Sequence, residues 1–84
     1  MIIRYYSTPQ CNICKSLKPK VIELAKKYNI TFEYVDLNEN EELKGQLLLF
    51  SVPAVIFFDE DREMKRFVRT FGIIELEDFI QRVM

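Results

Sequence analysis

The residues of this chain whose type and spacing can do redox or metal chemistry are Cys11 and Cys14. Only Asn12 and Ile13 separate them, so one helical turn can bring the two sulfur atoms within bonding distance. Such a pair can be a reversible dithiol–disulfide couple, half of a metal site, or two buried structural thiols. The surrounding sequence has to discriminate among these three chemistries.

A metal site is the poorest fit to the rest of the composition. A structural zinc site takes four ligands, and this chain has two Cys and no His. A mononuclear site within one chain therefore lacks ligands, although a metal or cluster shared between two chains stays open. The lack of His also excludes a Cys–His nucleophilic pair. We expect no resident metal or other cofactor.

The elements expected around the cysteines favour redox chemistry. Residues 2–7 are apolar and aromatic and predict a buried strand, and a polar turn follows. From residue 12 to residue 28 apolar side chains recur at steps of three and four, which predicts an amphipathic helix. Pro19 lies inside that helix and is expected to kink it rather than end it. Both cysteines then lie at the start of the helix.

A helix N-terminus stabilises a thiolate through its partial positive charge and its free N–H groups. Lys15 and Lys18 add positive charge nearby. Because the thiolate is the attacking species in disulfide exchange, this placement favours a reactive Cys11.

The remaining segments predict an α/β domain. Strands are expected at 31–36, 54–58 and 63–68, and helices at about 41–50 and at 75–83. The order is βαβαββα. A helical connection makes the first two strands parallel, with a right-handed crossover, and a tight turn at 59–61 makes the last two antiparallel. The expected architecture is a four-stranded mixed sheet flanked by helices, in a single domain covering residues 1–84.

Length, composition and charge restrict the kinds of partner that the chain is expected to have. A chain of 84 residues predicts one domain, and its hydrophobic content of 49% is enough for a core without disulfide staples. A net charge of −1 gives no attraction to nucleic acid or to an anionic membrane. No run approaches the ~20 apolar residues of a membrane span, and no leader segment is visible. We expect a cytoplasmic monomer.

With these features together, the chain resembles the thioredoxin-like superfamily over almost its whole length. The resemblance rests on Cys11-Asn12-Ile13-Cys14 after a strand, on Lys15, on Pro19, and on Val52-Pro53 before a strand. The N-terminal part, which begins directly with the first strand, is similar to that of glutaredoxins, whereas the C-terminal half is similar to that of thioredoxins. A glutathione-binding glutaredoxin carries a Gly-Gly pair where this chain reads Glu63-Met64-Lys65-Arg66. The resemblance therefore favours a short thioredoxin-like protein over a glutathione-dependent reductase.

The resemblance implies a thioredoxin fold and a thiol–disulfide oxidoreductase. Cys11 would attack a protein disulfide, Cys14 would resolve the mixed disulfide, and a reductase or small thiol would restore the pair. The resemblance also implies a cis Pro53 that packs against the disulfide. The substrate would bind along the residues Asn12, Ile13, Ser51, Val52, Pro53 and Arg69, with the Val52 backbone pairing in β fashion.

Several positions depart from the family pattern. Tyr5 and Tyr34 stand where thioredoxins carry a buried carboxylate and often a Lys. A Tyr with a pKa near 10 is a poor base at neutral pH, so we expect slow release from the mixed disulfide, or a water as proton acceptor. The simpler interpretation is that both tyrosines fill the core. Gln10 replaces an aromatic residue. Arg69 replaces a glycine, and it narrows the groove, recruits an acidic partner or simply ends a strand in solvent.

Three further expectations remain open. A non-enzymatic module that binds a partner through the Val52-Pro53 groove is the second hypothesis, because the family's acid and aromatic positions are changed. The apolar run at residues 47–50 predicts a packed helix end, or a partner surface if part of it is exposed. Because no proline stands between the cysteines, we expect a less reducing pair than in a typical thioredoxin.

Overall fold

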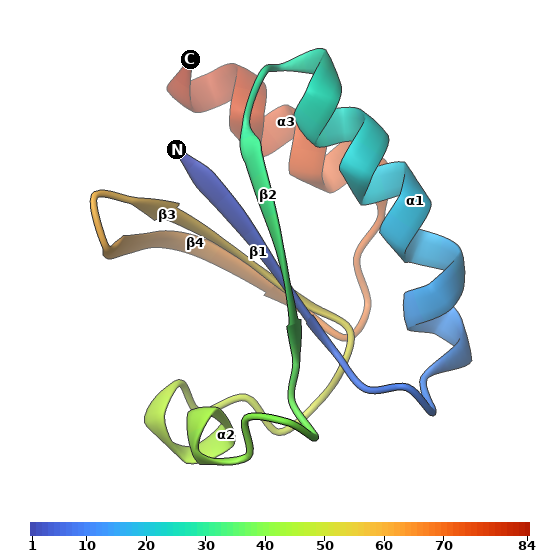
Figure 1. Ribbon diagram of the computed structural model, residues 1–84. Helices are drawn as coiled ribbons and strands as arrows, with labels where there is room; N and C mark the ends of the chain where they lie inside the picture. The colour runs from blue at the N-terminus through green and yellow to red at the C-terminus, as the bar shows by residue number, and fades with distance from the viewer.

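The computed structural model describes residues 1–84 and has the predicted element order βαβαββα. The elements are β1 Ile2–Ser7, α1 Asn12–Lys27, β2 Thr31–Asp36, α2 Glu42–Gln46, β3 Ala54–Asp59, β4 Arg62–Val68 and α3 Ile73–Val83. The strands form one sheet in the order β2-β1-β3-β4 (Figure 1). As predicted, β1 and β2 are parallel and β3 and β4 are antiparallel, and β1 also pairs antiparallel with β3. None of the helices has both the length and the apolar character needed to cross a membrane.

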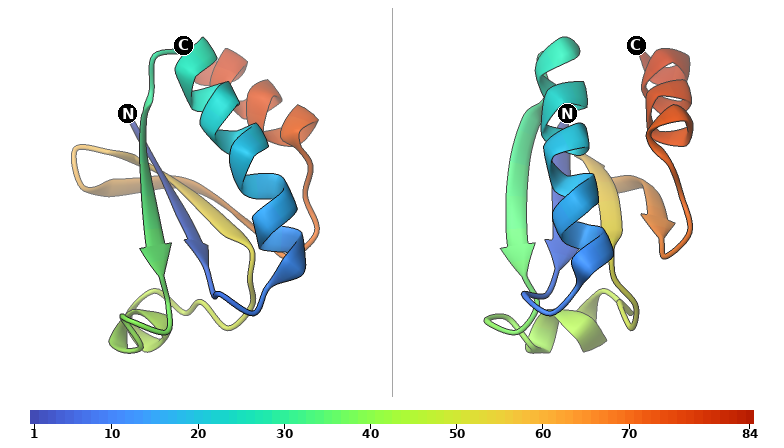
Figure 2. Two further views of the ribbon diagram at one scale, coloured as in Figure 1. Left: turned by 45° about the vertical axis from the view of Figure 1, so that its right-hand side comes forward. Right: turned by 90° about the vertical axis from the view of Figure 1, so that its right-hand side faces the viewer.

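The two faces of the sheet bury separate apolar clusters, because successive side chains of a strand point to opposite faces. Along β3, Val55 and Phe57 join the cluster packed against α1 and α3. Ile56 and Phe58 join the cluster on the other face, together with Leu49 from the segment after α2. Figure 2 shows α1 and α3 side by side on their face of the sheet. The central strand β3 is therefore apolar on both faces, which explains its unbroken hydrophobic sequence.

Helix α1 begins at Asn12 and continues through Pro19, so the prediction that this proline does not end the helix is confirmed. The helix ends where Asn29 adopts a left-handed conformation, with φ 56°, which Asn tolerates well. The backbone N–H of Ile30 then donates to the carbonyl of Ala25 at 2.8 Å. This ending reverses the chain and leads it into β2.

The prediction of a helix over residues 41–50 is wrong beyond Gln46. Leu48 takes a left-handed conformation, with φ 56°, and the N–H of Leu49 donates to the carbonyl of Lys44 at 2.8 Å. This is a Schellman ending with leucine at the position usually held by glycine. Turning the chain here allows Leu49 to be buried against the sheet, and leaves Leu48 69% and Phe50 77% exposed. The prediction of a packed helix end is therefore wrong for Leu48 and Phe50.

Helix α3 and strand β4 begin one or two residues before their predicted starts. Helix α3 begins at Ile73 rather than at residue 75, because the Glu75 side chain accepts a hydrogen bond from the Gly72 N–H at 3.1 Å and so marks the third helical position. Strand β4 begins at Arg62, since Glu60 and Asp61 both have positive φ and form a two-residue hairpin turn.

The left-handed Leu48 leads to a prediction about stability. A leucine in this conformation is strained by clashes of its Cβ, whereas glycine is not. Since the Leu48 side chain is largely exposed, little packing is lost on its removal. Leu48→Gly is therefore expected to raise the free energy of unfolding by about 1 kcal/mol, measured by urea denaturation. The control Leu47→Gly changes a residue with φ −100° and should destabilise the protein. A less stable Leu48→Gly variant would contradict the assigned strain.

Candidate active site

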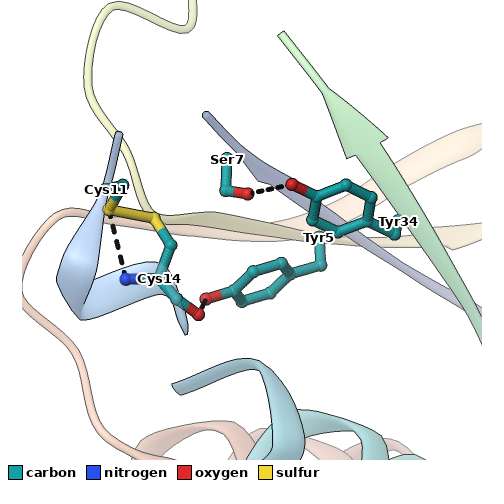
Figure 3. The surroundings of a disulfide bond; sticks show 5 residues. All are labelled: Tyr5, Ser7, Cys11, Cys14 and Tyr34. Atoms are coloured by element: carbon teal, nitrogen blue, oxygen red, sulfur yellow. Dashed lines mark hydrogen bonds between the residues drawn. A yellow bond between two sulfur atoms is a disulfide. The ribbon is translucent and has the colours of Figure 1, made fainter. Parts of the chain in front are cut away.

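The two cysteines form a disulfide at the junction of β1 and α1, with their Cα atoms 5.2 Å apart (Figure 3). Cys11 is the N-cap residue of α1 and has an extended backbone. Its Sγ accepts a hydrogen bond from the Cys14 backbone N–H at 3.1 Å. The same N–H and the positive end of α1 would stabilise negative charge on the Cys11 sulfur after reduction.

Burial distinguishes the two cysteines. Cys14 is only 2% exposed and belongs to the core cluster under α1 and α3. Cys11 is partly exposed at the start of the helix, Asn12 is exposed, and Ile13 is 68% exposed. Cys11 is therefore the solvent-accessible cysteine of the pair, and Cys14 is shielded from solvent.

Tyr5 lies beneath the cysteine pair and is fully buried. Its hydroxyl donates a hydrogen bond to the Cys14 carbonyl oxygen at 2.8 Å (Figure 3). Burial, with a smaller contribution from Tyr34, raises the pKa of Tyr5 to about 12. At neutral pH this phenol is thus a neutral donor and not a base. The interpretation of Tyr5 as core filler holds for its ring, but it missed the hydrogen bond of its hydroxyl.

Tyr34 is not core filler, because its side chain is substantially exposed on the edge strand β2. Its hydroxyl accepts a hydrogen bond from the buried Ser7 hydroxyl at 2.8 Å. The ammonium group of Lys18 lies 4.0 Å from the centre of the Tyr34 ring, a cation–π arrangement. Tyr34 therefore helps to keep the Lys18 ammonium group on the side of α1 that faces β2.

The loop before β3 carries the other predicted site residues. The Val52–Pro53 peptide bond is cis. Pro53 is buried, whereas Ser51 and Val52 are partly exposed. Both Val52 and Cys11 pack against the core cluster that contains Cys14. The structure thus brings the loop and the cysteine pair, which are about 40 residues apart in the sequence, onto the same core cluster.

Arg69 directly follows β4, and its side chain is exposed. Its backbone has φ 70°, a left-handed conformation that glycine adopts without strain. Its N–H donates to the Pro53 carbonyl oxygen at 2.9 Å. The backbone of Arg69 therefore fixes the loop at Pro53, while its charged side chain lies in solvent near that loop.

Gln10, which precedes Cys11, accepts a hydrogen bond from the Asn38 side-chain amide at 3.0 Å. This contact joins the turn before Cys11 to the segment after β2. The sequence shows Gln10 as a departure from the family pattern but does not indicate its hydrogen-bond partner Asn38. No local signal identifies Asn38, because the two residues are 28 positions apart and meet only in the folded chain.

The arrangement of fold and site defines a class of protein. A helix-capping, partly exposed Cys joined to a buried Cys, on a four-stranded mixed sheet with α1 and α3 on one face, is the site of a thiol–disulfide oxidoreductase with a thioredoxin fold. The thioredoxin family model matches residues 1–82, and the chain belongs to the thioredoxin family.

Three known proteins illustrate the similarity. The chain is 40% identical to thioredoxin 1 of the thermophilic eubacterium Thermosipho africanus, with a TM-score of 0.93, over 99% of this chain and 93% of that one. It is 29% identical to the thioredoxin-like protein YdfQ of Bacillus subtilis, over 94% of this chain and 71% of that protein. It is 24% identical to thioredoxin Asp f 28 of Aspergillus fumigatus, over 99% of this chain and 77% of that protein. The expectation of a thiol–disulfide oxidoreductase is thereby confirmed.

Proposed function

We propose that the chain reduces or exchanges disulfides of protein substrates, with Cys11 as the attacking thiol and Cys14 as the resolving thiol. The observation that carries this assignment is the position of the Cys11 sulfur. It caps α1, accepts the Cys14 N–H at 3.1 Å and is partly exposed, whereas Cys14 is buried. These are the conditions that favour a nucleophilic thiolate at Cys11.

The reaction begins with both cysteines reduced. The Cys11 thiolate attacks one sulfur of the substrate disulfide, forming a mixed disulfide, and the other substrate sulfur leaves as a thiolate and takes up a proton. Cys14 then loses its proton and attacks the Cys11 sulfur. The second substrate sulfur leaves and is protonated in turn. The substrate gains two electrons and two protons, and the chain is left with the Cys11–Cys14 disulfide.

The proton of Cys14 needs an acceptor other than Tyr5. The Tyr5 hydroxyl already donates to the Cys14 carbonyl, and its pKa of about 12 makes it a poor acceptor at neutral pH. We infer that water, or the departing substrate thiolate, takes this proton. The result expected is a longer-lived mixed disulfide than in thioredoxins that carry a carboxylate at this position.

The proposed substrate surface has two sides. Asn12 and Ile13 form the side next to Cys11, and both are exposed. The loop residues Ser51, Val52 and Pro53 form the other side, where the Val52 backbone would pair with an extended substrate segment. The partial exposure of Ser51 and Val52 supports this role.

The proposed partners are protein disulfides and a reductase that restores the dithiol. A segment of the NADPH-dependent thioredoxin reductase 3 of Arabidopsis thaliana is 31% identical to this chain over 68 residues, which are 13% of that protein. That relationship supports a thioredoxin reductase as the electron source. The cysteine pair carries the electrons itself, so the proposal invokes no cofactor. We further propose that the protein works as a cytoplasmic monomer.

The test is the reduction of insulin disulfides by dithiothreitol, with and without the protein. Acceleration by the protein supports the proposed function. A thioredoxin reductase with NADPH, or glutathione with its own reductase, is then supplied in place of dithiothreitol to identify the electron source. A protein that folds but leaves the insulin rate unchanged, with a Cys11 alkylation pKa near the free-thiol value of ~8.5, would instead be a non-enzymatic binding module.

Arg69 leads to a prediction about substrate choice. We propose that its exposed guanidinium favours substrates with acidic residues beside the disulfide. A surface ion pair of this kind is worth about 0.2–1 kcal/mol, so the wild type should prefer an acidic over a basic disulfide peptide by about threefold in kcat/KM. Arg69→Gly removes the charge and relieves the left-handed strain at this position.

The Arg69→Gly variant should therefore treat both peptides alike at low ionic strength and should be more stable than the wild type. Arg69→Lys keeps the charge and should keep the preference. An unchanged preference in Arg69→Gly would assign Arg69 to a solvated strand end without a role in recognition.

A further inference from the structure

The side chain of Arg66 connects β4 to the end of α2. Its Nη1 donates to the carbonyl oxygen of Leu47 at 2.7 Å. Its Nε and Nη2 donate to the two carboxylate oxygens of Glu63, each at 2.7 Å. Three donors of one planar guanidinium are thus directed at fixed acceptors, which restricts the side chain to one orientation.

The Leu47 carbonyl oxygen, which accepts the Arg66 Nη1 hydrogen bond, lies at the C-terminal end of α2. Leu47 is the C-cap residue of α2, where backbone carbonyls have no partner within the helix and carry the negative end of its dipole. Helix α2 has only five residues, a length that is not stable without contacts from elsewhere in the fold. Arg66 supplies such a contact as a charged donor, alongside the burial of Leu49 against the sheet.

The segment from Leu47 to Pro53 is held from β4 at both ends. At its start, the Leu47 carbonyl accepts from the Arg66 side chain. At its end, the Pro53 carbonyl accepts from the Arg69 backbone at 2.9 Å. Between these two anchors lie Ser51 and Val52, whose backbone forms one side of the proposed substrate groove. Their position therefore depends on the anchor at each end.

We propose that Arg66 is a positioning residue for substrate binding: by fixing the Leu47 carbonyl, it holds the Ser51–Val52 backbone in place to pair with a disulfide-bearing segment. The proposal rests on the proposed function. Its three hydrogen bonds go to the Leu47 carbonyl and to Glu63, and none goes to a cysteine. Its loss should therefore weaken substrate binding without changing the reactivity of Cys11.

The test compares Arg66→Met with Arg62→Met. Methionine keeps an apolar stem of similar length but no donor. Arg62 lies on the same strand, its side chain is exposed, and it makes no hydrogen bond to the loop. For Arg66→Met, KM for insulin is expected to rise about 3- to 10-fold, less than the full contribution of a charged hydrogen bond, because the anchor at Pro53 remains. Its kcat and the alkylation rate of Cys11 should stay within about twofold of the wild type.

Two further variants test whether Arg66 acts through its charged donors and its orientation by Glu63. Arg66→Lys keeps one charged donor without the fork and should recover part of the KM change. Glu63→Gln weakens the orientation of Arg66 and should raise KM by a smaller factor than Arg66→Met. Arg62→Met should leave KM unchanged.

Hydrogen exchange gives a readout that does not depend on activity. The backbone amides of Leu48 and Leu49 donate to the carbonyl oxygens of Gly45 and Lys44 at the end of α2. They should exchange about tenfold faster in Arg66→Met, as expected for the loss of about 1.4 kcal/mol of local protection, while the amides of β1 and β3 are unaffected. Faster loop exchange with a raised KM supports the proposal. An unchanged KM, an unchanged loop exchange, or an equal loss in kcat and Cys11 alkylation would overturn it. If the wild type itself does not reduce insulin, the proposed function fails, and the exchange measurement still decides whether Arg66 holds the loop.

Discussion

The Cys11→Ser variant should reduce insulin disulfides at least about a thousandfold more slowly than the wild type, because removing a catalytic nucleophile has effects of this size. A serine hydroxyl at residue 11 can still cap α1, because an oxygen there can accept the Cys14 N–H as the sulfur does. It cannot become an attacking thiolate. The variant therefore removes the chemistry and keeps the local fold.

The matched measurement is the rate of insulin reduction by dithiothreitol for the wild type, Cys11→Ser and Ser16→Ala. Ser16 lies on the exposed side of α1 and belongs to no part of the proposed site, so its variant should keep the wild-type rate. Turnover by Cys11→Ser at more than a few per cent of the wild-type rate would refute Cys11 as the attacking thiol.

The roles of the two cysteines are separated by Cys14→Ser. In this variant Cys11 can attack, but nothing resolves the mixed disulfide, so a covalent complex with the substrate should accumulate. Mass spectrometry under non-reducing conditions measures that complex directly. Because Cys14 is buried, Cys11→Ser should form no such complex. Accumulation of the complex in Cys11→Ser rather than in Cys14→Ser would reverse the assignment.

The parts of the fold that the sequence predicted well depend on local patterns. The start of α1 at Asn12 follows from the change of apolar spacing after the first strand, and the turn at Glu60 and Asp61 follows from its acidic, solvent-exposed sequence. The end of α2 could not be predicted in this way. Four consecutive apolar residues, 47–50, fit a helix and a turn equally well, and only the sheet decides that Leu49 is the buried one.

The site residues that the sequence predicted have a local pattern, and those that it missed depend on contacts made only in the folded chain. The cysteine pair and Val52-Pro53 carry their signals in residue type and spacing. The hydrogen bonds of Tyr5 to Cys14 and of Arg66 to Leu47 end on backbone carbonyl oxygens. Any residue offers such an acceptor, so its partner is determined by how α1 packs on β1 and by where the chain after α2 passes Arg66. Sequence reasoning recognised that position 5 is unusual, but it could not assign the contact.

Tyr5 is a core residue whose replacement should strongly affect stability. Tyr5→Ala removes a fully buried aromatic ring from the core, at a cost of about 3–5 kcal/mol, a large part of the 5–15 kcal/mol typical of a domain. Tyr5→Phe keeps the ring and removes only the hydroxyl that donates to the Cys14 carbonyl, at about 1–2 kcal/mol. Urea denaturation of the oxidised proteins at pH 7 measures both. Equal stability of Tyr5→Phe and the wild type would show that the hydrogen bond contributes nothing.

The raised pKa of Tyr5 gives the same residue a signature at high pH. In the unfolded chain its hydroxyl loses its proton near pH 10, whereas burial raises the pKa in the folded protein to about 12. Between these values the unfolded state binds fewer protons than the folded state, so the free energy of unfolding falls as the pH rises. The contribution of Tyr5 is fully present below pH ~10 and is lost by pH ~12, a change of about 2–3 kcal/mol at 1.4 kcal/mol for each pH unit.

The comparison that isolates Tyr5 is the difference in unfolding free energy between the wild type and Tyr5→Phe, measured from pH 8 to pH 12. Tyr6 has a pKa that is also raised by burial, and it contributes equally to both proteins and cancels in the difference. The stability advantage of the wild type should be constant up to about pH 10 and then decrease, because only the wild type has a Tyr5 hydroxyl to deprotonate. An advantage that stays constant to pH 12 would mean that Tyr5 titrates alike in both states. The hydroxyl would then not be shielded from solvent beneath Cys14.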